Sequence, residues 1–68
     1  MRLKELRKKA RISQEKLAKA IGLKQNNISR YETGEREASY ETLIKLADYY
    51  DVSIDYILER TDNPKVNR

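Results

Sequence analysis

The chain has 68 residues, a net charge of +4, no cysteine and no histidine, which fits a single domain. Without cysteine or histidine there is no disulfide, no thiolate or imidazole metal site and no imidazole general base, so catalysis could rest only on carboxylates, lysines or tyrosines. No carboxylate pair, nucleophile or phosphate-binding loop stands out, so we expect no metal, no cofactor and no enzymatic activity. No apolar stretch approaches the roughly 20 residues of a membrane span, and MRLKELRKKA lacks the apolar region of a signal peptide, so we expect a cytoplasmic protein.

The first half of the chain predicts three helices. Residues 2–10 carry an apolar stripe at i, i+3 and i+7, formed by Leu3, Leu6 and Ala10. Ser13 is a suitable N-cap for a second helix, and Gly22 suits its end, where the chain needs positive φ. A third helix is expected over residues 25–33, ending at Gly34.

The second half predicts two further helices and a polar end. Ser39 is the expected cap of a helix that reaches Tyr50, and Ser53 caps a short last helix ending near Leu58. We therefore predict an all-α fold of five helices over residues 1–60. Residues 61–68 form a polar C-terminal tail that we expect to fray.

The third predicted helix has an unusual outer face. Ile28 and Tyr31 turn inward, which turns Gln25, Asn26 and Arg30 outward. Amides and guanidinium groups read base edges in the DNA major groove. A helical hairpin with an ordinary polar surface is the alternative, but such surfaces more often carry Glu and Lys.

Charge is distributed unevenly along the chain. Residues 1–36 hold eleven Lys or Arg and four Asp or Glu, a net charge of +7. Residues 37–68 hold four Lys or Arg and seven Asp or Glu, a net charge of −3. One side of the domain is therefore expected to attract a polyanion.

Three segments resemble one known family: SQEKLAKAIGL, QNNISRYETG and ETLIKLADYYDVSIDYIL. Together with the first helix, they look like the Cro/repressor helix-turn-helix family, the Xre-type regulators of bacteria and phages. The resemblance covers residues 2–58. It implies a compact five-helix, lambda-repressor-like domain in which the second helix of the motif enters the major groove and the first crosses the backbone.

The resemblance also implies DNA contacts. Gln25 and Asn26 match the principal base-contacting residues, and Arg30 matches a further base or phosphate contact. Gln14 matches a residue that touches phosphate and braces the recognition helix. Asn27 and Ser29 are expected to hold phosphates.

Two positions depart from the family pattern. Lys24 stands where relatives often have a Ser or Thr cap, so it loses the cap and opposes the helix dipole. A bound phosphate would compensate for both, and we predict that Lys24 contacts the DNA backbone. The loop before the fourth helix lacks a proline that many relatives have, and Arg36 there is a candidate backbone contact.

Two further sets of residues match structural features of the family. Arg7 and Glu32 match an ion pair that links the first helix to the end of the third. Tyr56, Ile57 and Leu58 lie where relatives dimerise, and we expect them to form a two-fold interface.

These observations predict a sequence-specific DNA-binding regulator, a repressor that binds a palindromic double-stranded operator as a homodimer. Half-sites are expected about 10 bp apart. The chain is too short for a sensing domain, so we expect its regulation to come from its concentration, a competitor or a protein partner. A bacterial or phage-encoded, nucleoid-associated protein is expected. One alternative is an antitoxin-like protein whose main partner is another protein; nonspecific DNA coating is another.

Overall fold

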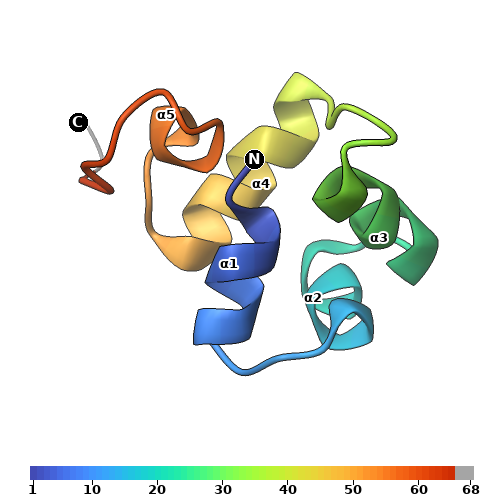
Figure 1. Ribbon diagram of the computed structural model, residues 1–68. Helices are drawn as coiled ribbons and strands as arrows, with labels where there is room; N and C mark the ends of the chain where they lie inside the picture. Colours follow the sequence, from blue (N-terminus) through green and yellow to red (C-terminus); the bar gives the residue numbers. More distant parts are fainter. Residues whose placement is uncertain (66–68) are drawn as a thin grey trace.

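Residues 1–65 are described by a computed structural model, and their secondary structure is entirely helical. The helices are α1 (Leu3–Lys9), α2 (Gln14–Ile21), α3 (Gln25–Thr33), α4 (Tyr40–Tyr50) and α5 (Ile54–Ile57), as Figure 1 shows. The predicted all-α fold with five helices is confirmed. None of the helices within this range is long and apolar enough to cross a membrane.

Serine residues begin three of the helices, as the sequence predicted. The hydroxyls of Ser13, Ser39 and Ser53 each accept a hydrogen bond from the backbone N–H three residues later. These bonds satisfy donors that have no partner within the helix. Gly22 ends α2 and Gly34 ends α3, with φ angles of 75° and 80°. A side chain at either position would be strained in this left-handed conformation.

Each helix contributes one fully buried apolar side chain to a single core. These side chains are Leu3, Leu17, Ile28, Leu46 and Ile57. Burying a side chain of this size stabilises a fold by roughly 1.5–3 kcal/mol. The helices are short, so this shared burial, rather than helix propensity, holds them in place.

The predicted inner stripe of α1 is only partly correct. Leu3 is buried and Leu6 packs against the core, but Ala10 is exposed. The helix ends at Lys9, and Arg11 adopts a left-handed conformation with φ of 59°. The chain therefore turns away before the third position of the stripe can face the core.

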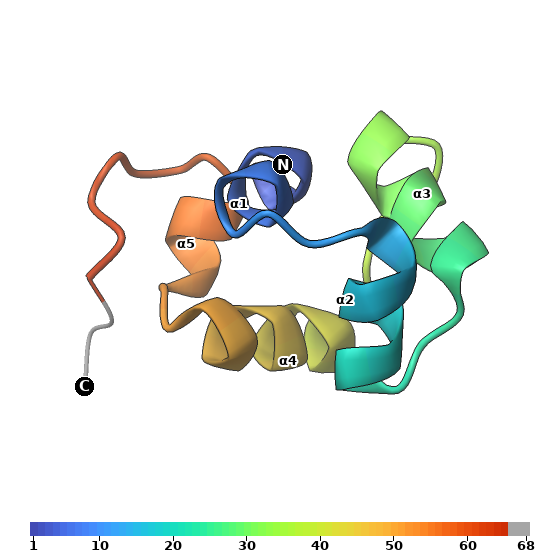
Figure 2. The same cartoon turned by 90° about the horizontal axis from the view of Figure 1, so that it is seen from below.

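The recognition helix predicted from sequence lies at one edge of the domain. α3 packs most extensively against α2, which ends at Gly22. Figure 2 shows α3 on the side of the molecule away from α5 and the tail. The outer face of α3 is therefore left accessible.

The part of the tail that the structure describes is attached to the domain. Arg2 Nη2 donates a 3.0 Å hydrogen bond to the carbonyl of Thr61, and the Ser53 N–H donates to the carbonyl of Pro64 at 3.1 Å. These bonds are contacts that the sequence does not reveal, because it does not show that the start of α1 meets this segment; the expected fraying of the tail stays a prediction. The predicted tail also includes residues 66–68, which lie outside the described residues.

Candidate nucleic-acid interface

One side of α3 is anchored and the other is free to meet a ligand. Ile28 and Tyr31 are buried, while Gln25, Asn26 and Arg30 are exposed. Two further candidates, Asn27 and Ser29, are half-buried on the flanks. The exposed side chains therefore stand on a helix whose position is set by the core beneath it.

The start of α3 lacks the cap that three other helices have. Lys24 occupies the N-cap with an extended backbone, and its exposed side chain makes no capping hydrogen bond. The first turn of α3 also contains no acidic residue. Free N–H groups and the positive end of the helix dipole favour an anion at such a position.

Gln14, at the start of α2, forms hydrogen bonds with two residues of α3, Glu32 near its end and Gln25 at its start. Its amide nitrogen donates to Glu32 Oε1 at 3.0 Å. Because a carboxylate only accepts, this bond turns the Gln14 carbonyl away from Glu32. Gln25 Nε2 lies 3.5 Å from that carbonyl oxygen and donates to it. This long, exposed hydrogen bond links the Gln25 side chain to Gln14.

Glu32 is held in turn by Arg7 of α1. Arg7 Nε donates to Glu32 Oε2 at 2.6 Å and Nη2 donates to Oε1 at 3.2 Å, while Nη1 donates to the carbonyl of Ile12 at 2.8 Å. Only 13% of the Arg7 side chain and 2% of the Glu32 side chain are exposed. The hydrogen bond to Glu32 raises the pKa of Arg7. This bidentate pair joins α1 to the last turn of α3.

Arg30 has a neighbour that the sequence pattern did not reveal. Its Nε lies 4.0 Å from Glu35 Oε2, and both side chains are exposed. The two residues are five apart, which is not a helical pair, and they meet because Gly34 reverses the chain between them. The backbone N–H of Arg36 donates to the Arg30 carbonyl at 3.3 Å, which places exposed Arg36 beside the end of α3.

The predicted dimer residues on α5 do not share one exposed face. Ile57 is fully buried, so its inclusion in an interface was wrong. The helix has a single turn, and that turn directs Ile57 into the core. Tyr56 is half-buried, and its ring lies under the Arg2 guanidinium, 4.4 Å from the ring centroid. Leu58 is exposed.

Comparison with known proteins connects this arrangement to a family. A family model described as Helix-turn-helix matches residues 3–57, which include all five helices. The chain belongs to this helix-turn-helix family. The resemblance that the sequence suggested is therefore confirmed.

Curated relatives of this helix-turn-helix chain come from Bacillus subtilis (strain 168). It is 41% identical over 66 residues to the HTH-type transcriptional regulator ImmR, covering 97% of the chain and 52% of ImmR. It is 42% identical over 69 residues to the uncharacterized HTH-type transcriptional regulator YobD, covering 98% of the chain and 62% of YobD. It is 39% identical over 64 residues to the uncharacterized HTH-type transcriptional regulator YqaE, covering 94% of the chain and 55% of YqaE. No solved structure was found to match.

The match is to part of each relative. The helix-turn-helix chain spans between 52% and 62% of the length of these three proteins. All three are named as transcriptional regulators.

Proposed function

We propose that this chain is a sequence-specific DNA-binding regulator that reads the major groove through α3. One observation carries the proposal: Gln25, Asn26 and Arg30 are exposed together on a helix whose opposite side is buried. A rigid support is what base readout requires, because a side chain that is already oriented loses less entropy when it binds.

Different side chains have different roles in this proposal. Gln25 and Asn26 carry amides that can pair in a bidentate manner with adenine, and Arg30 can pair with guanine or hold a phosphate. The remaining predicted contacts fix the register of the domain on the DNA backbone and read no base directly. They are Gln14, Lys24, Asn27, Ser29 and Arg36.

The proposed operator is palindromic and the bound form is a homodimer. A two-fold dimer presents two copies of α3 to half-sites about 10 bp apart, one helical turn of DNA. Repression then follows from occupying promoter DNA. The regulatory role is supported by the three relatives, each of which is named as a transcriptional regulator.

Selection of bound sequences from a random DNA library near physiological salt tests this function. We expect enrichment of a palindrome whose half-sites are one helical turn apart. Binding that falls with salt but enriches no sequence would contradict specific readout and point to nonspecific coating. Absence of DNA binding, with tight binding of another protein, would favour the antitoxin-like alternative.

A further inference from the structure

Arg30 and Glu35 form an ion pair at the end of the helix that we propose reads DNA. Arg30 lies one turn after Asn26, so both side chains project from the face opposite buried Ile28 and Tyr31. The Arg30 Nε lies 4.0 Å from Glu35 Oε2, and the two Nη groups make no hydrogen bond or closer ion pair within residues 1–65. The outer end of the guanidinium is therefore available to a ligand.

The turn after α3 places Glu35 beside Arg30. The Arg30 carbonyl accepts a hydrogen bond from the Thr33 hydroxyl at 3.2 Å and another from the Arg36 N–H at 3.3 Å. The Glu35 N–H donates to the Thr33 hydroxyl oxygen at 3.4 Å. Gly34 permits this reversal of the chain because its φ is 80°. Glu35 is therefore held near Arg30 by its backbone as well as by the exposed ion pair.

This is an unfavourable position for a carboxylate. Glu35 follows the C-terminus of α3, which is the negative end of the helix dipole. It also lies beside the face that we propose meets the phosphates of DNA. The side chains of Arg30 and Glu35 are 48% and 70% exposed, and ion pairs that are so exposed contribute little to stability. Stability of the fold therefore does not account for Glu35.

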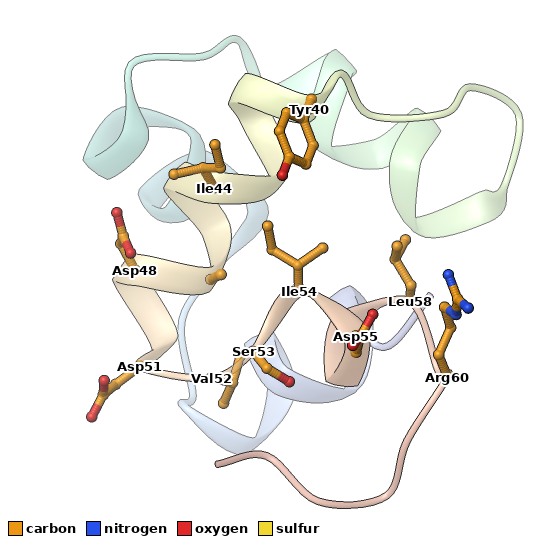
Figure 3. A pocket seen from close by; sticks show the side chains of 11 residues that line it. Tyr40, Ile44, Asp48, Asp51, Val52, Ser53, Ile54, Asp55, Leu58 and Arg60 are labelled. Carbon is orange, nitrogen blue, oxygen red and sulfur yellow. The ribbon is translucent and has the colours of Figure 1, made fainter. Parts of the chain in front are cut away.

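Three exposed carboxylates gather on another side of the domain, in a groove of about 650 Å³ between α4 and α5 (Figure 3). They belong to Asp48, Asp51 and Asp55. Figure 2 shows α5, and the end of α4 that leads to it, on the side away from α3. Within residues 24–36, by contrast, Glu35 carries the one exposed carboxylate, because Glu32 is buried against Arg7. A carboxylate beside the reading face is an exception to the separation of charge.

We propose that Glu35 is a positioning residue that directs Arg30 to a guanine instead of a phosphate. An ion pair through Nε leaves the two Nη groups as a fork that matches O6 and N7 of guanine. The carboxylate also repels phosphates, which every sequence offers, so it weakens the binding of sequences that lack the guanine. The inference rests on the proposed function, which left Arg30 with either contact, and it names a base that α3 reads.

Single-base variants of the operator selected from the random library provide the test. Fluorescence anisotropy at fixed salt measures the affinity of each full-chain variant for each labelled operator. Arg30→Ala should lose a preference for guanine at one base pair, and such a contact is worth roughly 5- to 150-fold. Glu35→Gln should lower the preference at the same base pair by roughly threefold or more, the scale of coupling between contacting side chains. It should also strengthen binding to operators without that guanine, because a negative charge is removed.

Two results would overturn the proposal. One is an unchanged guanine preference in Glu35→Gln. The other is an Arg30→Ala variant that weakens binding to all operators alike, since that behaviour marks a phosphate contact.

Glu37→Gln is the matched control. It removes the same charge from the same loop, and the Glu37 side chain is exposed and, within residues 1–65, not paired with Arg30. It should leave the guanine preference unchanged, and an equal loss of preference in both variants would contradict a specific role for Glu35. In an Arg30→Ala background, Glu35→Gln should no longer alter base preference, because Glu35 acts through Arg30. A change that persists there would also contradict the proposal.

Thermal unfolding distinguishes a role in readout from a role in folding. Glu35→Gln should have a Tm no lower than that of the unaltered chain, because a neutral side chain suits the C-terminus of α3 better. A clearly lower Tm would assign the pair to stability instead.

The library selection separates this inference from the function on which it rests. If the unaltered chain enriches no sequence, the proposed function fails and the inference fails with it. If a sequence is enriched and Gln25→Ala alters preference at one base pair, while Glu35→Gln alters preference at none, the inference on Glu35 fails alone.

Discussion

Gln14 donates its side-chain amide to Glu32 across 3.0 Å, and this bond joins the buried support of α3 to its outer face. On the inner side, Glu32 is paired with Arg7. On the outer side, Gln14 accepts a hydrogen bond from Gln25. The proposed sequence readout by α3 therefore involves residues for which we propose no base contact.

The Arg7–Glu32 pair should be essential for stability. Arg7→Met leaves a carboxylate that is 2% exposed without its cation, and such a loss costs about 3–5 kcal/mol. The whole chain is expected to have about 3–10 kcal/mol of stability, so this loss is a large fraction of the total and should clearly lower the urea midpoint. Urea unfolding followed by circular dichroism measures the change.

Two comparisons sharpen this test. Lys8→Met, which alters an exposed neighbour on α1, should change stability by no more than about 0.5 kcal/mol. The double variant Arg7→Met with Glu32→Met should recover much of the loss, since no buried charge remains. A double variant as unstable as Arg7→Met would mean that the cost is not electrostatic.

Gln25 and Gln14 should act together in base preference. Gln25→Ala should relax preference at one base pair, at a cost of roughly 1–3 kcal/mol. Gln14→Ala should weaken preference at the same base pair, because Gln25 then loses a hydrogen-bonding partner. Affinities for the selected operator and its single-base variants measure both effects. The double variant should lose less than the two single losses combined, and strict additivity would argue against coupling.

Lys24→Ser should improve stability and impair DNA binding. A serine at this N-cap supplies the missing hydrogen bond and should add about 1 kcal/mol to the free energy of unfolding. Loss of the lysine should weaken binding to all sequences alike. It should also reduce, by about one, the steepness with which the logarithm of the DNA-binding constant falls with the logarithm of salt concentration. Lys45→Ser, on α4, is the control for charge. A greater stability with an unchanged salt slope would show that Lys24 does not contact phosphate.

Tyr50 should make the fold sensitive to alkaline pH. Burial raises the pKa of the Tyr50 hydroxyl to about 12, with a further contribution from Tyr49. The folded state thus favours the neutral phenol, and this contribution is complete below the unfolded pKa of about 10. It is lost as the pH rises from about 10 towards 12.

Tyr50→Phe should remove this sensitivity. The Tyr50 hydroxyl is buried and has no hydrogen-bond partner among the described residues, so near pH 7 the substitution should change stability by less than about 1 kcal/mol. Thermal unfolding from pH 9 to 12 should then show a shallower fall in Tm than in the unaltered chain. Tyr40→Phe, which alters an exposed ring, is the comparison; an equal effect from both would rule out burial as the cause.

Local signals made the helices predictable. The three serine caps and the left-handed glycines Gly22 and Gly34 act within a few residues of the chain, so their identities mark the helix boundaries. The exposed face of α3 followed from helical periodicity once Ile28 and Tyr31 were placed inward.

Contacts between distant segments were not predictable in this way. The Arg2 guanidinium lies over the Tyr56 ring although 54 positions separate the two residues. The pattern of apolar residues within α5 does not predict this contact. The burial of Ile57 depends equally on where α1 and α4 place the core around it. The groove between α4 and α5 likewise appears only when the angle between two helices is known.

Arg2 also determines where the chain leaves the domain. Its guanidinium bonds to Thr61 and Asp62, and Figures 1 and 2 both show this segment on the side away from α3. A dye or a fused fluorescent protein attached after residue 65 would therefore project away from the proposed DNA. Such a label would permit measurements on single molecules with the reading surface left unobstructed.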